Sequence, residues 1–252
     1  MRESRVATVP SAQDVGSSDL AEIAVGVSAT LDTNEPVQPL ALEAQSAWSN
    51  PHFWYWPVKR CCDIAVAVMT IPLLLIILLP VSVLIFLEDG GTPLYRGEAI
   101  GYRGRRFKVY KIRTMRQDAD MYLDKHPELK AAFLEAFKLT DDPRILRCGR
   151  FLRKTSLDEL PQAINVLLGD MSWVGPRYVK EMELERYGSF ARMRLSMRPG
   201  ITGLWQISGR SNLSYSMRVV YDRTYYYTRS LRTDLKIFLL TIPSVLRRDG
   251  AV

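Results

Sequence analysis

The stretch IAVAVMTIPLLLIILLPVSVLIFL, residues 64–87, decides how this chain is built. It is 24 residues long and contains no charged side chain. A helix of about 20 apolar residues is enough to cross the hydrocarbon core of a bilayer, which is about 30 Å thick. The sequence therefore predicts a helical segment that lies in a membrane.

Basic residues flank this run on both sides. Lys59 and Arg60 precede it, and eight lysines and arginines follow between residues 96 and 116. Because basic flanks prefer the cytoplasmic side, both ends of the run favour the same side of the membrane. Pro80 removes a helical hydrogen bond and Pro72 offers a second kink, so we expect a re-entrant helical hairpin with Pro80 at its membrane kink. A kinked helix that spans the membrane is the alternative, since transmembrane helices tolerate proline.

The remaining chain divides by charge. Residues 1–57 carry two basic and seven acidic side chains, so the formal charge of +7 for the whole chain becomes +12 over residues 58–252. The first part has no sustained helical or strand period and lacks the apolar core of a signal peptide. We expect a disordered leader over residues 1–45, the membrane entry and hairpin over 46–90, and a cytoplasmic or interfacial catalytic domain over 91–252.

The composition also narrows the chemistry. A basic body favours anionic lipid head groups, polyanionic substrates or both, and no nucleic-acid-binding module is visible, so nucleic acid is not expected as a partner. Cys61, Cys62 and Cys148 lack the spacing of metal ligands. With only two histidines, zinc chemistry and histidine-based nucleophilic catalysis are both disfavoured. The chemistry is expected to rest on carboxylates and arginines.

Residue periodicity predicts an α+β fold that is mostly α. Short apolar and aromatic stretches separated by glycines predict a pair of strands over residues 94–116. Residues 118–139 have a helical period. Near the end, an apolar stripe over residues 235–246 predicts an amphipathic helix that lies on a membrane surface, with packing in the core as the alternative.

The segment TSLDELPQ, residues 155–162, carries the candidate chemistry. Ser156 and Glu159 have the spacing of a capping box, whereas Pro161 favours Asp158 as the N-cap of the following helix. In either register Asp158 lies at the positive end of a helix, which favours an ionised carboxylate and attracts phosphate. An ordinary structural cap is the plain alternative. Arg153, just upstream, is suited to neutralise phosphoryl charge.

A series of motifs around this segment resembles the bacterial sugar transferase family, the monotopic phosphoglycosyl transferases that begin lipid-linked glycan synthesis. The resemblance covers about residues 58–250. Its motifs are KR at 59–60, GYRGRRF at 101–107, YKIRTM at 110–115, TDDPRI at 140–145, GRFLRKTSLDELPQ at 149–162, GDMSWVGPR at 169–177 and RPGITGLWQ at 198–206.

The resemblance implies a kinked re-entrant helix in the inner (cytoplasmic) membrane of a bacterium, interfacial amphipathic helices, and a small catalytic domain that faces the cytoplasm. Pro80 matches the kinking proline of the family. The serine that often precedes that proline is replaced here by Leu79, so a side-chain hydrogen bond at the bend needs another donor, such as Ser82.

The resemblance also implies a reaction. Members of the family move a hexose 1-phosphate, usually of galactose or glucose in exopolysaccharide pathways, from a UDP-sugar to undecaprenyl phosphate and release UMP. Membrane lipids and the downstream glycosyltransferases that extend the glycan are the expected partners.

Site residues follow from the matched motifs. Asp158 would attack the phosphorus and form an aspartyl phosphosugar intermediate, and Asp158 with Glu159 would hold Mg²⁺. Arg153 would clamp phosphate. Pro176 and Arg177 match the start of the family's Pro-Arg-Pro segment at the nucleotide end, although Tyr178 replaces its second proline.

Two other classes of function fit the residues. One is a membrane scaffold without catalysis, and the other is a glycosyl transferase that moves only the sugar and releases UDP. Four further charged residues have either a structural or a binding interpretation. Lys111 and Arg113 would meet lipid head groups or substrate, and Asp142 and Arg144 would form a salt bridge or take part in catalysis.

Overall fold

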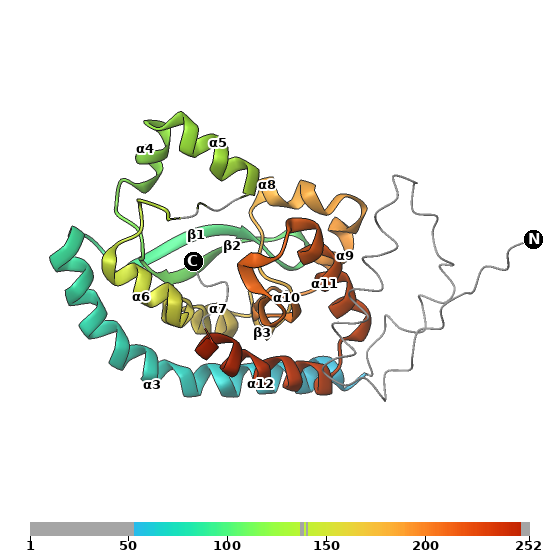
Figure 1. Ribbon diagram of the computed structural model, residues 1–252. Coiled ribbons are helices and arrows are strands. Elements are labelled where there is room, and N and C mark those ends of the chain that lie inside the picture. Colours follow the sequence, from blue (N-terminus) through green and yellow to red (C-terminus); the bar gives the residue numbers. More distant parts are fainter. Residues whose placement is uncertain (1–52, 137–138, 140, 248–252) are drawn as a thin grey trace, which may run out of the picture.

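The computed structural model of the chain describes residues 53–136, 139 and 141–247 (Figure 1). The fold is mostly helical with a few short strands, as the sequence predicted. The expected leader, residues 1–45, lies outside the described residues.

The apolar run forms one helix, α3 (Tyr55–Asp89), which continues through Pro72 and Pro80. It is curved and runs along one side of the body (Figure 1). The two arms of the expected hairpin are therefore not confirmed, because the bend is spread along a continuous helix. Ser82 Oγ donates to the carbonyl oxygen of Leu78 at 2.6 Å, which is the bend-stabilising bond expected in the absence of the family serine. Such back-bonding bends a helix without breaking it.

The described part of the chain contains one helix, α3, that is long and apolar enough to cross a membrane. One narrow face of α3 packs on the body through Ala67, Leu74, Val81 and Ile85. The rest of its surface is apolar and exposed, including Met69, Leu75, Ile76, Leu79, Phe86 and Leu87. A patch of this size on the surface marks contact with a membrane or a partner.

The two predicted strands are confirmed. β1 (Leu94–Ile100) and β2 (Arg106–Ile112) pair antiparallel around a short 3₁₀ turn. α7 (Gln162–Leu168) packs between β2 and α3, and α6 (Arg147–Thr155) packs on the second half of α3. The predicted helical stretch 118–139 is divided into α4 (Ala119–Asp124) and α5 (Pro127–Ala136), because Pro127 begins a new helix.

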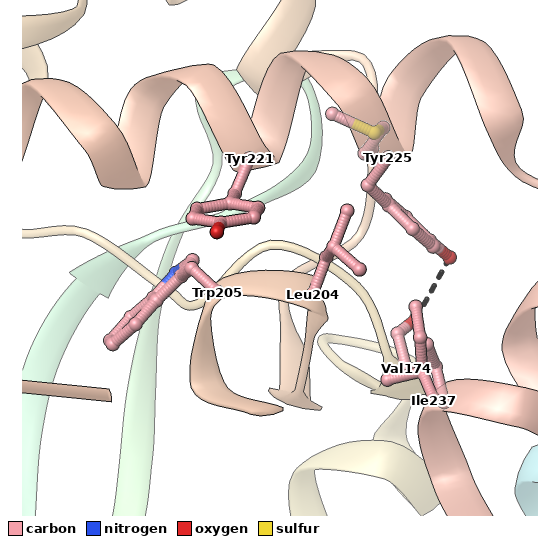
Figure 2. Close-up of a cluster of buried hydrophobic side chains, with 7 residues drawn as sticks. Val174, Leu204, Trp205, Tyr221, Tyr225 and Ile237 are labelled. Atoms are coloured by element: carbon pink, nitrogen blue, oxygen red, sulfur yellow. Dashed lines mark hydrogen bonds between the residues drawn. The ribbon is translucent and has the colours of Figure 1, made fainter. Parts of the chain in front are cut away.

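A second core lies in the C-terminal half. β3 (Ser172–Val174) and β4 (Gly200–Thr202) form a parallel pair, followed by α10 (Leu204–Ile207), α11 (Tyr215–Thr228) and α12 (Leu231–Arg247). Figure 2 shows Trp205 and Tyr221 facing each other between α10 and α11, with Leu204, Tyr225 and Ile237 nearby. Trp205 is therefore a core residue. The short helices α8 (Glu181–Leu184) and α9 (Ala191–Leu195) connect the two strands.

α12 is amphipathic. Ile237 is fully buried, whereas Leu235, Leu239, Ile242 and Leu246 are exposed in a stripe. The helix therefore uses one face for core packing and presents a second apolar face outward, so each of the two alternatives for residues 235–246 describes one face.

A buried cluster of four residues, here called the anchor cluster, ties the start of α3 to α12. Lys59 Nζ lies 2.6 Å from Asp234 Oδ2 and donates to the carbonyl oxygen of Val174 at 2.9 Å. The hydroxyl of Tyr55 donates to Asp234 Oδ2 at 3.0 Å, and that of Tyr225 donates to Oδ1 at 2.7 Å. One lysine thus faces one carboxylate, and two hydroxyls saturate the carboxylate oxygens.

The far end of α3 is held in the same manner. The guanidinium of Arg113, on the chain just after β2, pairs with Asp89 and also donates to the carbonyl oxygens of Gly90 and Thr92. Arg113 is buried. These contacts support a structural role for Arg113 at the end of α3.

Candidate active site

The TSLDELPQ segment forms a tight turn between two helices. Ser156 ends α6 in the left-handed conformation, with φ of 55°, and Leu157–Glu159 form a 3₁₀ turn before α7. Pro161, and not Asp158, stands at the N-cap of α7. The prediction of Asp158 as N-cap was therefore wrong. Ser156 does precede the 3₁₀ turn, but neither Ser156 nor Glu159 forms the capping-box bonds, because both side chains bind long-range partners. Ser156 Oγ accepts from Arg210 Nη2 at 2.7 Å, and Glu159 turns to two cations.

Glu159 is the centre of a charged network. Its Oε1 lies 2.7 Å from Arg177 Nη2 and 3.1 Å from Lys111 Nζ. Burial raises the pKa of Glu159, but Arg177 and Lys111 outweigh burial and hold the pKa well below its usual range. Glu159 is therefore ionised at neutral pH and keeps both cations in place.

Asp158 lies beside this network and is 7% exposed. Burial and the charge of Glu159 raise the pKa of Asp158, whereas Lys111, Arg153 and Arg177 lower it, and the net direction is upward. The ionised form of this carboxylate is thus weakly solvated. A carboxylate with few water molecules around it is a better nucleophile than a solvated one.

Arg153 approaches Asp158 from α6. Its Nε donates to Thr114 Oγ1 at 2.9 Å, and its charge interacts with Asp158 and Asp142. Burial lowers the pKa of Arg153 despite these acids. Asp142 and Arg144 pair at 2.6 Å and are almost completely buried, which supports the structural interpretation of that turn.

Tyr178 lies beneath the cations. Its ring centroid is 5.1 Å from the Arg177 guanidinium carbon and 5.6 Å from Lys111 Nζ. Cations over an aromatic face are stabilised electrostatically. The residue that departs from the family's Pro-Arg-Pro pattern therefore supports both cations that bind Glu159.

A buried arginine positions the segment of Pro176 and Arg177 from behind. Arg194 is 1% exposed, and its Nη2 donates to the carbonyl oxygens of Pro176, at 3.3 Å, and of Arg177. Its Nε lies 4.0 Å from Asp222 Oδ2, which accepts a 2.7 Å hydrogen bond from Tyr187. Sequence reasoning missed Arg194 and Asp222, because each lies far along the chain and in no motif of recognised chemistry.

The fold brings most of the predicted site together. We call the group formed by Lys111, Arg153, Asp158, Glu159 and Arg177 the active-site cluster. Pro176 positions it through its backbone. Lys111, for which lipid and substrate were alternatives, belongs to the cluster, and Arg210 is a neighbour that the sequence did not indicate.

The adjacent carboxylates suit a magnesium ion that also binds substrate. No group of three or more His, Cys, Asp or Glu side chains suited to a metal occurs among residues 53–136, 139 and 141–247. Mg²⁺ usually takes one or two carboxylates together with substrate phosphates and water. Asp158 and Glu159 are such a pair, so the donor set fits Mg²⁺ when a phosphate is present.

The fold and the site together combine a long, largely exposed apolar helix with a cluster of cations around two adjacent carboxylates. The motifs of the chain carry the identification further. The chain belongs to the bacterial sugar transferase family, whose model matches residues 54–248.

Similar proteins come from several bacteria. The UDP-galactose-lipid carrier transferase of Erwinia amylovora is 47% identical over 200 residues, which is 77% of this chain and 41% of that protein. The exopolysaccharide production protein ExoY of Sinorhizobium fredii is 44% identical over 77% of this chain and 87% of its own length. The undecaprenyl-phosphate galactose phosphotransferase of Salmonella typhimurium is 43% identical over 77% of this chain and 41% of its own. The matched part of this chain thus spans less than half of two of these three relatives.

Proposed function

We propose that this protein transfers a hexose 1-phosphate, of galactose or glucose, from a UDP-sugar to undecaprenyl phosphate and releases UMP. The reaction would begin the repeat unit of an exopolysaccharide. The observation that carries the proposal is the weakly solvated carboxylate of Asp158 surrounded by Lys111, Arg153 and Arg177. The family and the activities in the names of two relatives, a UDP-galactose-lipid carrier transferase and an undecaprenyl-phosphate galactose phosphotransferase, support it.

The proposed reaction has two steps. In the first, a carboxylate oxygen of Asp158 attacks the phosphorus that carries the sugar, the bond from this phosphorus to the UMP oxygen breaks, and UMP leaves with the electron pair. In the second, an oxygen of undecaprenyl phosphate attacks the same phosphorus, the bond to Asp158 breaks, and the carboxylate is restored. A covalent intermediate divides one difficult transfer into two easier ones.

The surrounding side chains serve this chemistry through charge. Lys111, Arg153 and Arg177 favour ionised Asp158, and the same cations stabilise charge on the transferred phosphoryl group. Arg177 is assigned to the nucleotide end. When bound by Asp158 and Glu159, Mg²⁺ supplies a Lewis acid for the diphosphate oxygens.

The membrane arrangement is a second part of the proposal. We infer that α3 enters the inner membrane and returns to the cytoplasmic side, and that the exposed stripe of α12 lies at the lipid surface. Single cysteines at Phe53 and Thr92, before and after α3, test this in a chain without its native cysteines. A membrane-impermeant maleimide should label both only after the cells are opened. Labelling of one of them in intact cells would mean that α3 spans the membrane.

The activity is tested with purified protein in nanodiscs that contain undecaprenyl phosphate and Mg²⁺. UMP and UDP are measured with a panel of UDP-sugars for wild type and Asp158→Asn. We expect UMP with at least one sugar and a loss of about 10³-fold or more in the variant. Asp124→Asn, which removes the carboxylate of an exposed ion pair with Lys130, is the matched control and should retain activity.

Each contrary outcome points to one alternative. UDP as the product would identify a glycosyl transferase that moves only the sugar. Absence of nucleotide release from folded wild-type protein with every donor would favour the scaffold function. Full activity in Asp158→Asn would exclude Asp158 as the nucleophile. Binding of downstream glycosyltransferases is a further expectation, to be tested by cross-linking in the native membrane.

A further inference from the structure

Two arginines to which the sequence analysis gave no role, Arg210 and Arg218, lie at the edge of the active-site cluster. Arg210 reaches it from the turn after α10, and Arg218 from α11. Arg210 Nη2 donates to Ser156 Oγ at 2.7 Å, two residues before Asp158. The charge of Arg210 interacts with Asp158, Glu159 and Arg177, and the charge of Arg218 interacts with Arg177.

Both guanidinium groups retain buried N–H groups for which the described residues supply no acceptor. These are Nη1 of Arg210 and Nε of Arg218. Arg218 is held over the ring of Trp205, with 4.9 Å between the guanidinium carbon and the ring centroid, so its position is set by the core. A buried donor without a partner is unfavourable, and an anionic acceptor would satisfy it.

The charge balance points in the same direction. Lys111, Arg153, Arg177, Arg210 and Arg218 supply positive charge to this region, while Asp158, Glu159 and the nearby Glu183 supply negative charge. Asp142 and Asp222 also interact with Arg153 and Arg218, but each of these two acids is paired with a further arginine, Arg144 or Arg194. Cations therefore exceed carboxylates. Like charges at this spacing repel each other in a partly buried region, and a phosphate between them would remove the repulsion.

We propose that Arg210 and Arg218, together with Arg177, form an arginine site for a phosphoryl group of the substrates. The inference rests on the proposed function and adds two binding residues to it. A planar guanidinium can donate to two phosphate oxygens at once, so three of them can enclose a phosphate or diphosphate group. The phosphate comes either from the diphosphate of the UDP-sugar or from undecaprenyl phosphate.

A purely structural role for Arg210 gives a different expectation. Ser156 has a left-handed backbone, and Arg210 would serve only to hold its hydroxyl. In that case removal of the hydroxyl by Ser156→Ala would have the same effect as removal of the guanidinium. The two variants therefore separate a clamp from a binding site.

The experiment measures binding of inorganic pyrophosphate to the full chain in nanodiscs, which requires no turnover. We compare wild type, Arg210→Gln, Arg218→Gln, Arg210→Lys and Ser156→Ala. Arg192→Gln, on the exposed side of α9, removes the same charge away from the site and is the matched control. Thermal unfolding of each variant verifies that it is folded.

We expect both glutamine variants to bind pyrophosphate at least about tenfold more weakly, since a charge-assisted hydrogen bond contributes about 1.5–3 kcal/mol. Arg210→Lys should lose less, and Ser156→Ala and Arg192→Gln should stay within about threefold of wild type. Equal losses in Ser156→Ala and Arg210→Gln, or unchanged binding in both glutamine variants, would overturn the proposal.

Kinetics of the same variants identify the source of the phosphate. A raised KM for the UDP-sugar assigns the site to the donor diphosphate, and a raised KM for undecaprenyl phosphate assigns it to the acceptor. If wild type transfers no sugar phosphate, the proposed function fails, while the pyrophosphate titration still decides whether the arginine site exists.

Discussion

The anchor cluster and the active-site cluster are both buried groups of charges, but they differ in balance. In the anchor cluster Lys59 pairs with Asp234, and two tyrosine hydroxyls and a carbonyl oxygen complete the hydrogen bonds, with Asp63 as a second acid that interacts with Lys59. In the active-site cluster three cations surround two adjacent carboxylates, and two more arginines lie at its edge.

The difference suggests that the anchor cluster serves stability and the active-site cluster serves function. The hydrogen bonds of the anchor cluster are made within the protein, so we expect its main role to be joining α3 to the body. A cluster with excess charge and adjacent carboxylates is costly to fold without a ligand of opposite charge. Such a cost is expected where a protein must bind and transform a phosphate.

The largest expected effect comes from breaking the balanced cluster. Asp234→Asn removes the carboxylate that pairs with Lys59 at 2.6 Å and leaves only the interaction of Lys59 with Asp63, so we expect a loss of about 3 kcal/mol in stability. Thermal unfolding in detergent measures this loss. Asp118→Asn, in an exposed pair with Arg116, should cost less than about 1 kcal/mol. Similar losses in the two variants would contradict the structural role of the anchor cluster.

Breaking the active-site cluster should reduce activity more than stability. Arg177→Gln removes one of two cations that pair with Glu159 but also relieves repulsion with the neighbouring cations, and Lys111 remains beside Glu159, so the loss in stability should be smaller than that of Asp234→Asn. UMP release should fall by about 10²-fold, since the interaction with the nucleotide end is lost. A variant that unfolds readily but retains kcat/KM would reverse the assignment.

A double substitution sharpens the comparison. Lys59→Met with Asp234→Asn removes both charges of the ion pair and keeps an acceptor for the two tyrosine hydroxyls, and it should recover about 1–3 kcal/mol relative to Asp234→Asn alone. In the active-site cluster, Lys111→Met with Glu159→Gln should recover no activity relative to Glu159→Gln. Thermal unfolding and UMP release are the two measurements, and restored turnover in the second pair would show that this cluster is merely structural.

The smallest effect concerns Asp222, behind the active-site cluster. Burial raises the pKa of Asp222 to about 6, although Arg194 and Tyr187 oppose it. The folded protein therefore holds this proton where the unfolded chain has lost it, and the contribution of Asp222 to stability falls as the pH rises from about 4 through 6. The melting temperature of Asp222→Asn relative to wild type should rise over this range by at least about 2 °C. A difference that is constant with pH would refute this titration.

Local patterns predicted the parts of the fold that local forces determine. The strand pair 94–116 and the apolar helix follow from alternation and run length, and Ser82 was identified as the donor near Pro80. The capping box at Ser156 was predicted wrongly because Arg210, which is 54 residues away, takes the hydroxyl of Ser156. Local spacing cannot weigh a partner that only the tertiary fold supplies.

The candidate site divides in the same way. Asp158 and Glu159 share one motif, so the sequence located them together. Lys111 lies on β2, 48 residues before its partner Glu159 in the sequence. The sequence therefore could not decide whether Lys111 meets lipid or substrate. Arg194 and Asp222 come from separate helices and meet only in the core. The predictable part of the site is the part that lies within one continuous segment.

Lys111 and Arg113 lie on one extended segment, and this segment links the active-site cluster to the end of α3. Lys111 binds Glu159 in the active site, and Arg113 holds the last turn of α3. One residue, Ile112, lies between them, so about 7 Å of extended backbone joins the two positions. If α3 is embedded as proposed, this segment is a fixed spacer between the bilayer and the reacting phosphorus. A thinner or thicker bilayer would then alter turnover by raising or lowering the whole site relative to the lipid phosphate.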